Sequence, residues 1–460
     1  MSGARRGSPA VLLGAPAELG AAGLAALRLT VRPLTDPADL GRWRDACVAR
    51  LVERASARVP FVRRLLERGG LAPRDVRTVR ALAALPVTSR RDLQEADVAD
   101  RVAGDLGVDR LLDRSTSGST GERVVVKRTW VEERLLNAFR WRALREYGYR
   151  VRDRRALVHF LSGEDPRDDQ TLQRVAQRIG LLRRRVFDAI GDPGFADGVV
   201  AFAPQVVTGM ASALARLADE VAARGHRLQP RFVVSGGELL TTPLRSRIAR
   251  LGAPIHDTYG CNEVNLIAWE CPHGAGGYHV CDDALVLEVL GSDDRPVAVG
   301  EWGEVVVTSL HAHAMPVIRI RLGDVAVRGP ERCPCGAPFS TLLAIRGRTF
   351  DTFALGGGVT LHPWEILAAI DAQLGWVRSC QMVQVARDAI ELRVVPASAP
   401  SPATVRQMED AARLALAGRA RFAVQLVAAI EPGASGKTRP FVALAGATSG
   451  DATTPEVERT

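Results

Sequence analysis

The sequence predicts an α/β protein in which a large N-terminal domain of mixed sheets and helices precedes a small, mobile α+β domain. Three observations support this class. With 460 residues and 49.4 kDa, the chain exceeds the size at which a single hydrophobic core usually stops growing. Short β-branched runs alternate with helical stretches between about residues 110 and 310, as in α/β proteins. A strand–helix–strand pattern then closes the chain. We place the domains at 1–345 and 346–445, with a polar tail at 446–460 that we expect to be disordered.

The elements are predicted in chain order from their periodicity. Residues 36–100 have apolar positions at helical spacing, and Asp36 is suited to cap the first helix. The predicted strands that follow are "RVVVK", "RALVHFL", "GVVAF", "QVVTGM", "RFVVSGG" and "IHDTYG". "ALVLEVL" and "GEVVVTSL" flank a turn-rich segment, which predicts an antiparallel pair. A domain boundary is predicted near "AIRGRTFD" (344–351), and beyond it the helix "TVRQMEDAARLALAG" lies between strand segments.

The composition argues against nucleic-acid and membrane partners. The formal net charge is +9, but the arginines are scattered through helical patterns and form no basic block interleaved with aromatic residues. No apolar segment reaches the roughly 18–20 residues that span a bilayer, and Glu18 interrupts the apolar run near the N-terminus. Seven cysteines, an odd number in a long chain, do not suggest a secreted disulfide framework. We therefore expect a cytoplasmic protein that binds neither nucleic acid nor membrane.

Four segments have the composition of a nucleotide-using active site. The first is "STSGSTGERVVVK" (115–127), in which small hydroxyl residues and glycines directly precede a β-branched strand. Glycine lets the backbone approach a ligand closely, and hydroxyls together with backbone N–H groups can surround a polyphosphate. The spacing of a P-loop is absent. Taken alone, the segment is equally compatible with an ordinary loop.

The second and third segments offer an aromatic ring and two carboxylates. "HDTYGCNEVNLIAWEC" (256–271) places Tyr259 and Glu263 close together, where they can stack on a base and hold Mg²⁺ near phosphates. The alternative is a Tyr-Gly turn followed by an apolar helix. "MPVIRIRLGDVAV" (315–327) is a predicted strand closed by a Gly-Asp turn, in which Asp324 can accept hydrogen bonds from ribose hydroxyls or cap the turn.

The fourth segment, "GASGKTRPF" (433–441), contains one of only two lysines among 61 basic residues. In a chain that otherwise uses arginine, Lys437 marks a position where a compact ammonium group is preferred over a broad, planar guanidinium. The other lysine, Lys127 in "RVVVKRT", is interpreted as a solvated charge at the end of a strand.

In this order and spacing, the four segments resemble the adenylate-forming superfamily, which comprises acyl-CoA synthetases, luciferases and the adenylation domains of peptide synthetases. The resemblance is greater to the phenylacetate–CoA ligase branch, through "ALPVTSRRDLQ", "SGGELL" (235–240), "EVVVTSLHAHAMPVIRIRLGDVA", "CPCG" and "IRGRTFD". It extends from about residue 40 to residue 445.

The resemblance implies a two-step reaction. A carboxylate attacks the α-phosphorus of ATP, giving an acyl-adenylate and pyrophosphate, and the thiol of coenzyme A then attacks the acyl carbon to give a thioester. Mg²⁺ accompanies ATP in this family. A small-molecule carboxylate, an aryl or arylacetic acid, is the expected substrate, and the protein is expected to be an AMP-forming acid–thiol ligase.

The resemblance also implies which residues carry these roles. Lys437 would reach from the small domain to the carboxylate and the α-phosphate, and Glu263 would bind Mg²⁺. The ATP site would comprise Ser117, Gly118, Ser119, Thr120 and Gly121 on the phosphates, Gly236, Gly237, Glu238, Tyr259 and Gly260 at the adenine, Asn262 beside Glu263, Asp324 on the ribose, and Arg348 near the hinge. The acyl pocket is expected around His159, Thr208, Gly209, Met210, Ser235 and His256, which include few charges.

Two cysteine-containing segments predict a structural zinc site. "WECPHGAGGYHVC" (269–281) and "RCPCGAP" (332–338) combine four cysteines with two histidines, and such clusters in cytosolic proteins favour metal over disulfides. By resemblance to zinc-containing members of the branch, the ligands would be Cys271, His279, Cys333 and Cys335. His273 and Cys281 are alternative ligands, and reduced cysteines in loops are the alternative to a metal site.

The sequence departs from the family at several positions. Asn262 stands where threonine usually precedes the magnesium-binding acid, and Glu122-Arg123 replaces the usual Lys-Pro. Phe350 occupies the usual position of the hinge acid, which serves rotation between the two half-reactions. These changes bear on the second step more than on the first. The alternatives are therefore transfer of the acyl group to an amine or a carrier-protein thiol, or a catalytically degenerate, zinc-stabilised binding module. A homodimer is compatible with the sequence.

Overall fold

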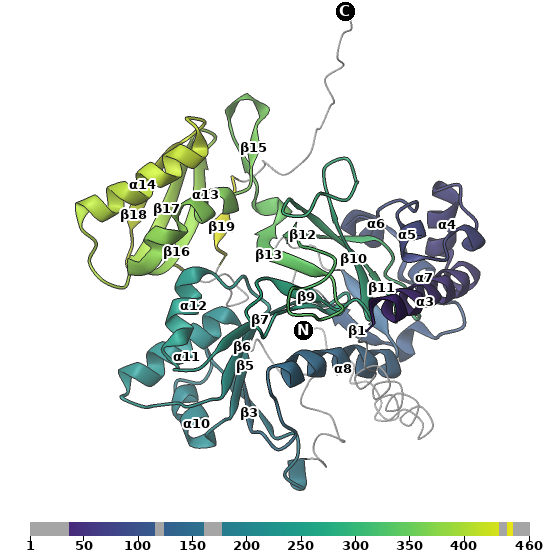
Figure 1. Cartoon of the computed structure of the whole chain (residues 1–460), viewed down its shortest axis with the longest axis horizontal. Helices are drawn as coiled ribbons and strands as arrows, with labels where there is room; N and C mark the ends of the chain where they lie inside the picture. The colour runs from purple at the N-terminus through teal and green to yellow at the C-terminus, as the bar shows by residue number, and fades with distance from the viewer. Residues whose placement is uncertain (1–35, 116–123, 161–176, 432–438, 445–460) are drawn as a thin grey trace, which may run out of the picture.

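The computed structural model describes residues 36–115, 124–160, 177–431 and 439–444. These residues form an 11-stranded sheet, a four-stranded sheet and two two-stranded sheets, with helices packed on the sheets (Figure 1). The order of the large sheet is β10-β11-β12-β13-β9-β8-β7-β6-β5-β3-β4. The predicted α/β class is confirmed.

The N-terminal helices form a layer with its own apolar core. Asp36 accepts a hydrogen bond from the backbone N–H of Ala38, so it caps the first described helix as predicted. Cys47, Val48 and Leu51 of that helix are among the buried residues of this core. The helices are α3 (Pro37–Arg58), α4 (Pro60–Arg68), α5 (Val79–Leu82), α6 (Arg90–Glu95) and α7 (Val98–Arg101), with the 3-10 helices η1 (Pro73–Asp75) and η2 (Val108–Arg110).

One half of the large sheet is parallel and is covered by helices on both faces. Its strands are β3 (Arg155–His159), β4 (Arg184–Asp188), β5 (Val206–Gly209), β6 (Phe232–Gly236) and β7 (Ile255–Cys261). The helices are α8 (Trp130–Glu146), α10 (Phe195–Phe202), α11 (Ala211–Ala223) and α12 (Thr242–Ala249). Successive residues of β6 point to opposite faces, since Phe232 and Val234 pack in the core that contains α8, whereas Val233 packs with α11.

One strand prediction in this half is wrong. "GVVAF" (198–202) lies in α10, where Phe195, Ala196 and Val199 form the buried side of a helix. Five apolar residues in a row fit a buried strand and a buried helix equally well. Phe195 and Ala196 precede this run, and together with Val199 they give the apolar spacing of a helix.

The other half of the large sheet is antiparallel. Its strands are β8 (Asn265–Glu270), β9 (Tyr278–Val280), β10 (Leu285–Leu290), β11 (Trp302–Ser309), β12 (Ile320–Arg328) and β13 (Thr341–Arg348), and the predicted pairing of β10 with β11 is confirmed. The apolar residues that follow Tyr259 form strand β8, so the alternative interpretation of this segment as an apolar helix is wrong. The predicted Gly-Asp turn is wrong: Gly323, at φ +75°, and Asp324 lie inside β12, and the ladder continues past an irregularity at Val325.

The C-terminal segment builds a second sheet around its own core. Strands β16 (Val377–Ala386), β17 (Ala389–Pro396), β18 (Arg421–Leu426) and β19 (Phe441–Val442) form the sheet β18-β17-β16-β19, at the upper left of Figure 1. Helix α14 (Pro402–Leu416) separates β17 from β18, as predicted. The remaining elements are η4 (Thr349–Asp351), β14 (Phe353–Ala354), η5 (Gly356–Gly358), β15 (Thr360–Leu361), α13 (Trp364–Ile370) and η6 (Asp371–Trp376). The exact domain boundaries and the mobility of this unit remain predictions.

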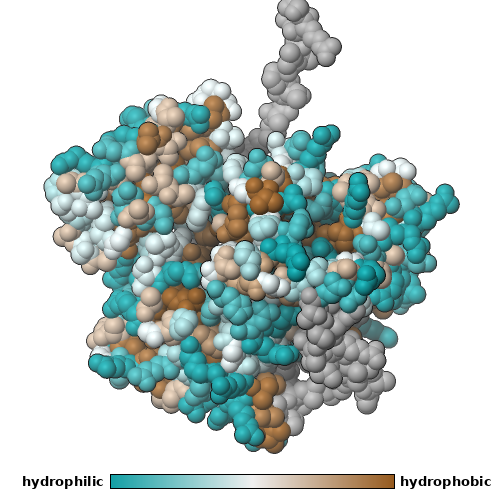
Figure 2. Space-filling view, in the orientation of Figure 1, coloured by the Kyte–Doolittle hydropathy of each residue, from teal (hydrophilic) through white to brown (hydrophobic). Residues whose placement is uncertain are grey.

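The visible surface is mainly hydrophilic, with hydrophobic residues scattered over it (Figure 2). Within the described ranges, no helix combines the length and the apolar character needed to cross a bilayer.

Candidate active site and metal centre

Two predicted site segments fall outside the described residues. They are the phosphate-binding residues Ser117, Gly118, Ser119, Thr120 and Gly121, and the catalytic Lys437. Their neighbours are described: β1 (Leu112–Ser115) and β2 (Val125–Arg128) precede and follow the first segment and pair in antiparallel register.

The second lysine is not a solvated charge. Lys127 Nζ lies 2.6 Å from Asp113 Oδ1, its cross-strand partner on β1, and the lysine side chain is only 14% exposed. The interpretation from sequence is therefore wrong, because pairing with Asp113 and packing in the hairpin withdraw the ammonium group from solvent.

Parallel pairing brings three predicted segments to one edge of the large sheet. Gly209 of β5 is the partner of Ser235 on β6, and Gly236 is the partner of Thr258 on β7. A Cβ atom at Gly236 would lie 2.5 Å from Thr258 Oγ1, so this position requires glycine. Gly237 follows at φ +81°, in the left-handed region that favours glycine. The carboxyl ends of parallel strands are the usual ligand-binding edge of such sheets.

The loop after β6 is anchored to helix α11 by Glu238. The Glu238 carboxylate accepts hydrogen bonds from the backbone N–H of Ser212 at 2.9 Å and from its hydroxyl at 2.5 Å. Ser212 lies in the first turn of α11, where N–H groups lack helical partners and favour an anion. The predicted adenine-bordering residues Gly236, Gly237 and Glu238 thus form a short, restrained loop.

Tyr259, Asp324 and Arg348 meet in one cluster, although 65 residues separate the first two. Tyr259 donates from its hydroxyl to Asp324 Oδ2 at 2.7 Å, and Arg348 Nε lies 3.3 Å from Asp324 Oδ1. Asp324 and Arg348 are cross-strand partners on β12 and β13. Burial raises the pKa of the Asp324 carboxyl, while Arg348 and the Tyr259 hydroxyl oppose that shift. Burial also raises the pKa of the Tyr259 hydroxyl, with Asp324 adding to the effect, so the tyrosine remains a donor.

Glu263 is a buried carboxylate whose two oxygens have different surroundings. It lies in the turn between β7 and β8, is 2% exposed, and accepts at Oε1 from Arg90 Nη2 at 2.8 Å. Oε2 is buried and has no nitrogen or oxygen hydrogen-bond partner among the described residues. A buried carboxylate oxygen of this kind suits a hard cation such as Mg²⁺. The Cys261 thiol lies beside the carboxylate, and burial together with Glu263 raises the pKa of that thiol.

The predicted acyl-pocket residues lie on neighbouring strands but not on one face. His159 ends β3, Thr208 and Gly209 end β5, and Met210, which follows, is buried. Ser235 is on the α11 face of β6. His256 is on the α8 face, where its ring stacks on Tyr147 with centroids 3.9 Å apart and an interplanar angle of 4°. Burial lowers the pKa of His256, so the ring is neutral at pH 7. Their role in binding the acid remains a prediction.

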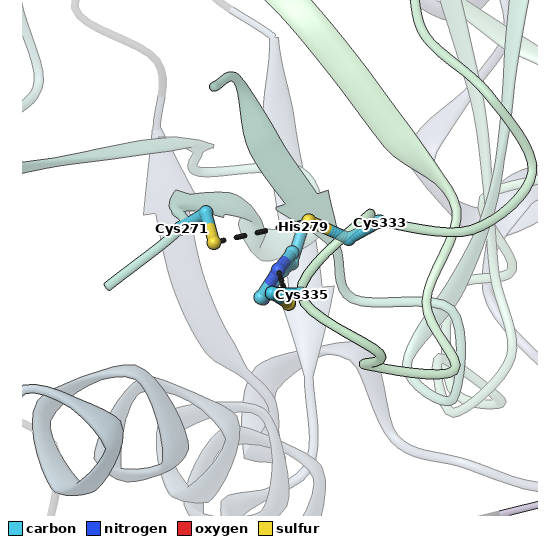
Figure 3. A group of neighbouring side chains, drawn as sticks. All are labelled: Cys271, His279, Cys333 and Cys335. Carbon is cyan, nitrogen blue, oxygen red and sulfur yellow. Dashed lines mark hydrogen bonds between the residues drawn. The ribbon is translucent and has the colours of Figure 1, made fainter. Parts of the chain in front are cut away.

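The four predicted zinc ligands converge on one point (Figure 3). The ligand atoms of Cys271, His279, Cys333 and Cys335 all lie within 4.8 Å of one another, with Cys271 Sγ 3.8 Å from Cys333 Sγ and Cys335 Sγ 3.3 Å from His279 Nε2. Tetrahedral zinc with bonds of about 2.3 Å to sulfur and about 2.0 Å to nitrogen requires separations of roughly 3.5–3.8 Å. A disulfide requires about 2.05 Å. The donor set and its spacing therefore fit zinc.

The sheet explains why these distant residues meet. Cys271 follows β8, His279 lies in β9, and Cys333 and Cys335 lie in the loop between β12 and β13. β9 pairs with both β8 and β13, so His279 is the cross-strand partner of Trp269 and of Thr341.

The surroundings of the cluster also suit a metal. Burial of Cys271 acts against ionisation, but backbone N–H groups of Ala275 and His273 bond the sulfur, and the net effect lowers the pKa of the thiol. His279 Nδ1 is buried without a hydrogen bond and lies 3.7 Å from Glu146 Oε2, a carboxylate positioned to orient the ring.

Neither alternative ligand joins the cluster. His273 is exposed. Cys281 is buried 3.8 Å from Asp283 Oδ1, outside the group of four.

Sequence reasoning missed three residues around these sites. Arg90 bonds Glu263, Arg128 donates to the backbone carbonyls of Asn262 and Glu263, and Glu146 faces His279. Arg90 lies within the "ALPVTSRRDLQ" segment, which was a usable signal. No sequence signal marked Arg128 or Glu146, because each is one of many charged residues on the predicted strands and helices.

Comparison with known proteins finds relatives of one kind. No family model matches the sequence. The chain is 28% identical over 342 residues to a phenylacetate-coenzyme A ligase of Thermus thermophilus, covering 70% of this chain and 73% of the relative. It is 26% identical over 334 residues to a phenylacetate-coenzyme A ligase of Aromatoleum evansii, covering 68% and 71%.

Solved structures agree on the fold. A 2-hydroxyisobutyryl-CoA ligase in the postadenylation state superposes with a TM-score of 0.71 at 23% identity, over 90% of this chain and 91% of that one. The same enzyme in the thioesterification state gives 0.60 at 22% identity, with 90% and 91% coverage. An anthranilate CoA ligase gives 0.52 at 18%, with 73% and 67% coverage. The chain is thus similar in sequence to phenylacetate-coenzyme A ligases and similar in fold to CoA ligases of known structure.

Proposed function

We propose that this protein activates a carboxylic acid with ATP and transfers the resulting acyl group to coenzyme A. The curated relatives are phenylacetate-coenzyme A ligases, and the matched structures include CoA ligases with acyl-AMP bound. An aryl or arylacetic acid is the proposed substrate. The six residues proposed for the acyl pocket support this class, because they include no carboxylate, lysine or arginine, and burial lowers the pKa of His256, one of the two histidines among them.

The observation that carries the proposal is the cluster of Tyr259, Asp324 and Arg348 beside Glu263. A partly buried acid held between a tyrosine hydroxyl and an arginine is a suitable acceptor for two adjacent ribose hydroxyls. The fixed orientation of the Tyr259 side chain leaves its ring as a rigid stacking surface for adenine. Tyr259 lies near the carboxyl end of β7, at the binding edge of the parallel strands, and Asp324 of β12 is bonded to it there.

In the proposed reaction, Glu263 Oε2 would hold the Mg²⁺ of Mg–ATP, and a cation there would supply positive charge beside the phosphates. Lys437 supplies a further positive charge there. At about 4 Å and an effective dielectric of about 20, that attraction is roughly 4 kcal/mol before desolvation is subtracted. Because the charge on the α-phosphoryl oxygens grows as the carboxylate attacks, this cation acts mainly in the transition state.

We further propose that Cys271, His279, Cys333 and Cys335 hold a structural zinc ion. The four ligands leave no open coordination position, and the cluster tethers the β12–β13 loop to β8 and β9. A closed site of this kind stabilises the fold and takes no part in acyl transfer.

The test is a panel of aryl, arylacetic and small aliphatic carboxylates with ATP and Mg²⁺, in which pyrophosphate release and thioester formation are scored with and without coenzyme A. We expect acid-dependent pyrophosphate release and a thioester only when coenzyme A is present. Pyrophosphate release without a thioester would assign the acyl group to an amine or carrier-protein acceptor. No release with any acid would overturn the proposal in favour of a binding module.

A further inference from the structure

The turn that carries Asn262 and Glu263 is bonded to a buried arginine that the proposed reaction does not use. Arg128 ends strand β2 and is 2% exposed. Its Nη2 donates to the backbone carbonyl of Asn262 at 2.5 Å and to that of Glu263 at 2.8 Å. A guanidinium group is suited to this contact, because its planar fork can reach two acceptors at once. Strand β2 is thereby tied to the turn.

The charge of Arg128 is balanced within the protein. Glu133 Oε2, in the first turn of α8, accepts from Arg128 Nη1 at 3.1 Å. Glu133 Oε1 lies 3.0 Å from Arg114 Nη2 and accepts from Asn137 Nδ2 at 3.1 Å. Burial favours the neutral acid, but the two arginines outweigh it, and the pKa of Glu133 is lowered. Arg128 is therefore held by a permanent anion and needs no charge from a ligand.

Helix α8 also holds the far end of the same turn. Asn265 Nδ2 donates to Asn137 Oδ1 at 3.2 Å, and Asn265 has a φ of +72°, which asparagine tolerates better than most residues. The turn of residues 261–265 is thus bonded to α8 through Arg128 and Glu133 at its centre and through Asn137 at its end. Few peptide units remain free to change the orientation of Glu263.

The side chain of Glu263 is fixed as well. Arg90 Nη2 holds Oε1, so Oε2 is the oxygen that remains for a ligand. The main chain and the side chain of this one residue are therefore restrained by different arginines from different elements, β2 and α6.

We propose that Arg128 is a positioning residue for the nucleotide and metal site: by holding the carbonyls of Asn262 and Glu263, it fixes where Glu263 Oε2 meets Mg²⁺–ATP. This inference rests on the proposed function, because it takes Glu263 as the magnesium ligand. Arg128 itself touches neither the metal nor the nucleotide. Its removal should weaken metal-dependent nucleotide binding and leave metal-independent binding unchanged.

The test compares Arg128→Met and Arg128→Lys with Arg142→Met. Arg142 is a matched control: it is also buried, and it bonds the buried acid Asp283, which lies outside the turn, at 2.6 and 2.5 Å. Binding of ATP is measured by calorimetry with Mg²⁺ and again with chelator, without any carboxylate. The Mg²⁺ dependence of acid-stimulated pyrophosphate release is then measured at saturating ATP.

For Arg128→Met we expect the Kd of Mg²⁺–ATP and the Mg²⁺ midpoint to rise about 10- to 100-fold, the range typical for loss of a residue that orients a metal ligand. ATP binding in chelator should not change. Arg128→Lys should give a smaller rise, because an ammonium group can reach the carbonyls without bridging both as the fork does. Arg142→Met should lower the melting temperature and leave both metal measurements at wild-type values.

Wild-type metal dependence in Arg128→Met would overturn the inference, and so would an equal effect in Arg142→Met. If Arg128→Met does not fold, the same measurements are made on Arg128→Lys, and wild-type metal dependence in that variant would overturn the inference. A wild-type protein that binds Mg²⁺–ATP but activates no acid would contradict the proposed function, and the calorimetric comparison would still decide the role of Arg128.

Discussion

Asp324 is the residue on which the proposed nucleotide site depends most. Its two carboxylate oxygens are held separately, Oδ2 by the Tyr259 hydroxyl and Oδ1 by Arg348 Nε, so the carboxylate is fixed before any ligand arrives. Fixed acceptors lose less conformational entropy on binding than free ones. Sequence alone suggested the ribose role for Asp324 but not the bond to Tyr259, because 65 residues separate the two.

Replacing Asp324 with asparagine should weaken ATP binding. Loss of a hydrogen bond to a charged group costs about 1.5–3 kcal/mol, so we expect the KM for ATP to rise by roughly 10- to 100-fold in acid-dependent pyrophosphate release. Asp219→Asn is the control, because Asp219 is another partly buried carboxylate paired with arginines, outside the proposed site. An unchanged KM in Asp324→Asn would remove Asp324 from the nucleotide site.

Lys437 should be needed for the first half-reaction only. Lys437→Ala is expected to abolish acid-dependent pyrophosphate release and to leave thioester formation from a supplied acyl-adenylate largely intact, because the α-phosphate charge that it balances develops during adenylation. Lys127→Ala is the natural control, since Lys127 is the other lysine and pairs with Asp113. Normal adenylation by Lys437→Ala would exclude it from the mechanism.

Single residues were predictable where their type is rare. Two short cysteine-containing segments predicted a metal site, and the resemblance gave the ligand set of Cys271, His279, Cys333 and Cys335, which lie together in the structure. The rarity of lysine pointed to Lys437, whose role stays a prediction. Arg128 could not be predicted in this way. With arginine so common in the chain, its sequence context says nothing of the two backbone carbonyls that it contacts.

At the level of elements, β9 organises the Cys/His cluster. This strand of three residues pairs with β8 on one side and β13 on the other, and the four ligand residues come from these strands and the loop beside them. A strand so short makes few bonds of its own, which explains why a cross-link through His279 would matter to its stability.

The zinc proposal predicts one bound zinc per chain in protein purified without chelator. Cys335→Ser should remove the metal and lower the melting temperature by roughly 5–10 °C, since each kcal/mol of lost stability lowers it by about 2–4 °C in a large domain. The KM for ATP should not change. Cys281→Ser should keep the metal, because Cys281 lies outside the cluster. Substoichiometric zinc in untreated wild-type protein would count against the site.

Strand β7 contains a buried acid that should affect stability through pH. Burial raises the pKa of Asp257 from 3.8 to about 7, although Tyr278 donates to Oδ2 at 2.8 Å and acts to lower it. Because the folded pKa lies above the unfolded one, the folded protein binds the extra proton, and stability decreases as pH rises from about 4 to about 7.

Asp257→Asn should remove the part of the pH dependence of stability that comes from this carboxyl group. Wild type and variant are compared by urea unfolding between pH 4.5 and 8, and we expect the difference in unfolding free energy to shift in favour of the variant as pH rises to about 7, then to level off. A difference that does not vary with pH would show that Asp257 titrates alike in the folded and unfolded states.

Element types were predictable where the period was long and were ambiguous where it was short. Helix α14 and the strands around it follow from complete periods over their whole length. "GVVAF" failed because five apolar residues carry no period. The Gly-Asp turn failed because Gly323 distorts β12 locally while its hydrogen bonds to neighbouring strands continue.

At the scale of the whole molecule, the described C-terminal residues contact the rest of the protein through polar pairs as well as through apolar contacts such as that of Leu239 with the C-terminal core. Arg378 of β16 pairs with Asp219 of α11, which also pairs with Arg247 and Arg250, and Thr242 bonds Asp371 at 2.6 Å. Arg378 is half exposed, and exposed pairs contribute only about 0–1 kcal/mol each. A junction of this kind is compatible with the rotation predicted between half-reactions. Sequence could not reveal it, because the paired residues come from distant segments with no shared pattern.

The central claim is that an acyl-adenylate lies on the reaction path, and an isotope experiment tests it most directly. An accepted carboxylate carrying ¹⁸O in both oxygens is incubated with the protein, ATP, Mg²⁺ and coenzyme A, and the AMP is analysed by mass spectrometry. Attack of the carboxylate on the α-phosphorus, followed by thiolysis at the acyl carbon, leaves one labelled oxygen in the AMP phosphate. We predict AMP that carries one ¹⁸O per thioester formed. Unlabelled AMP, or ADP in its place, would contradict the account.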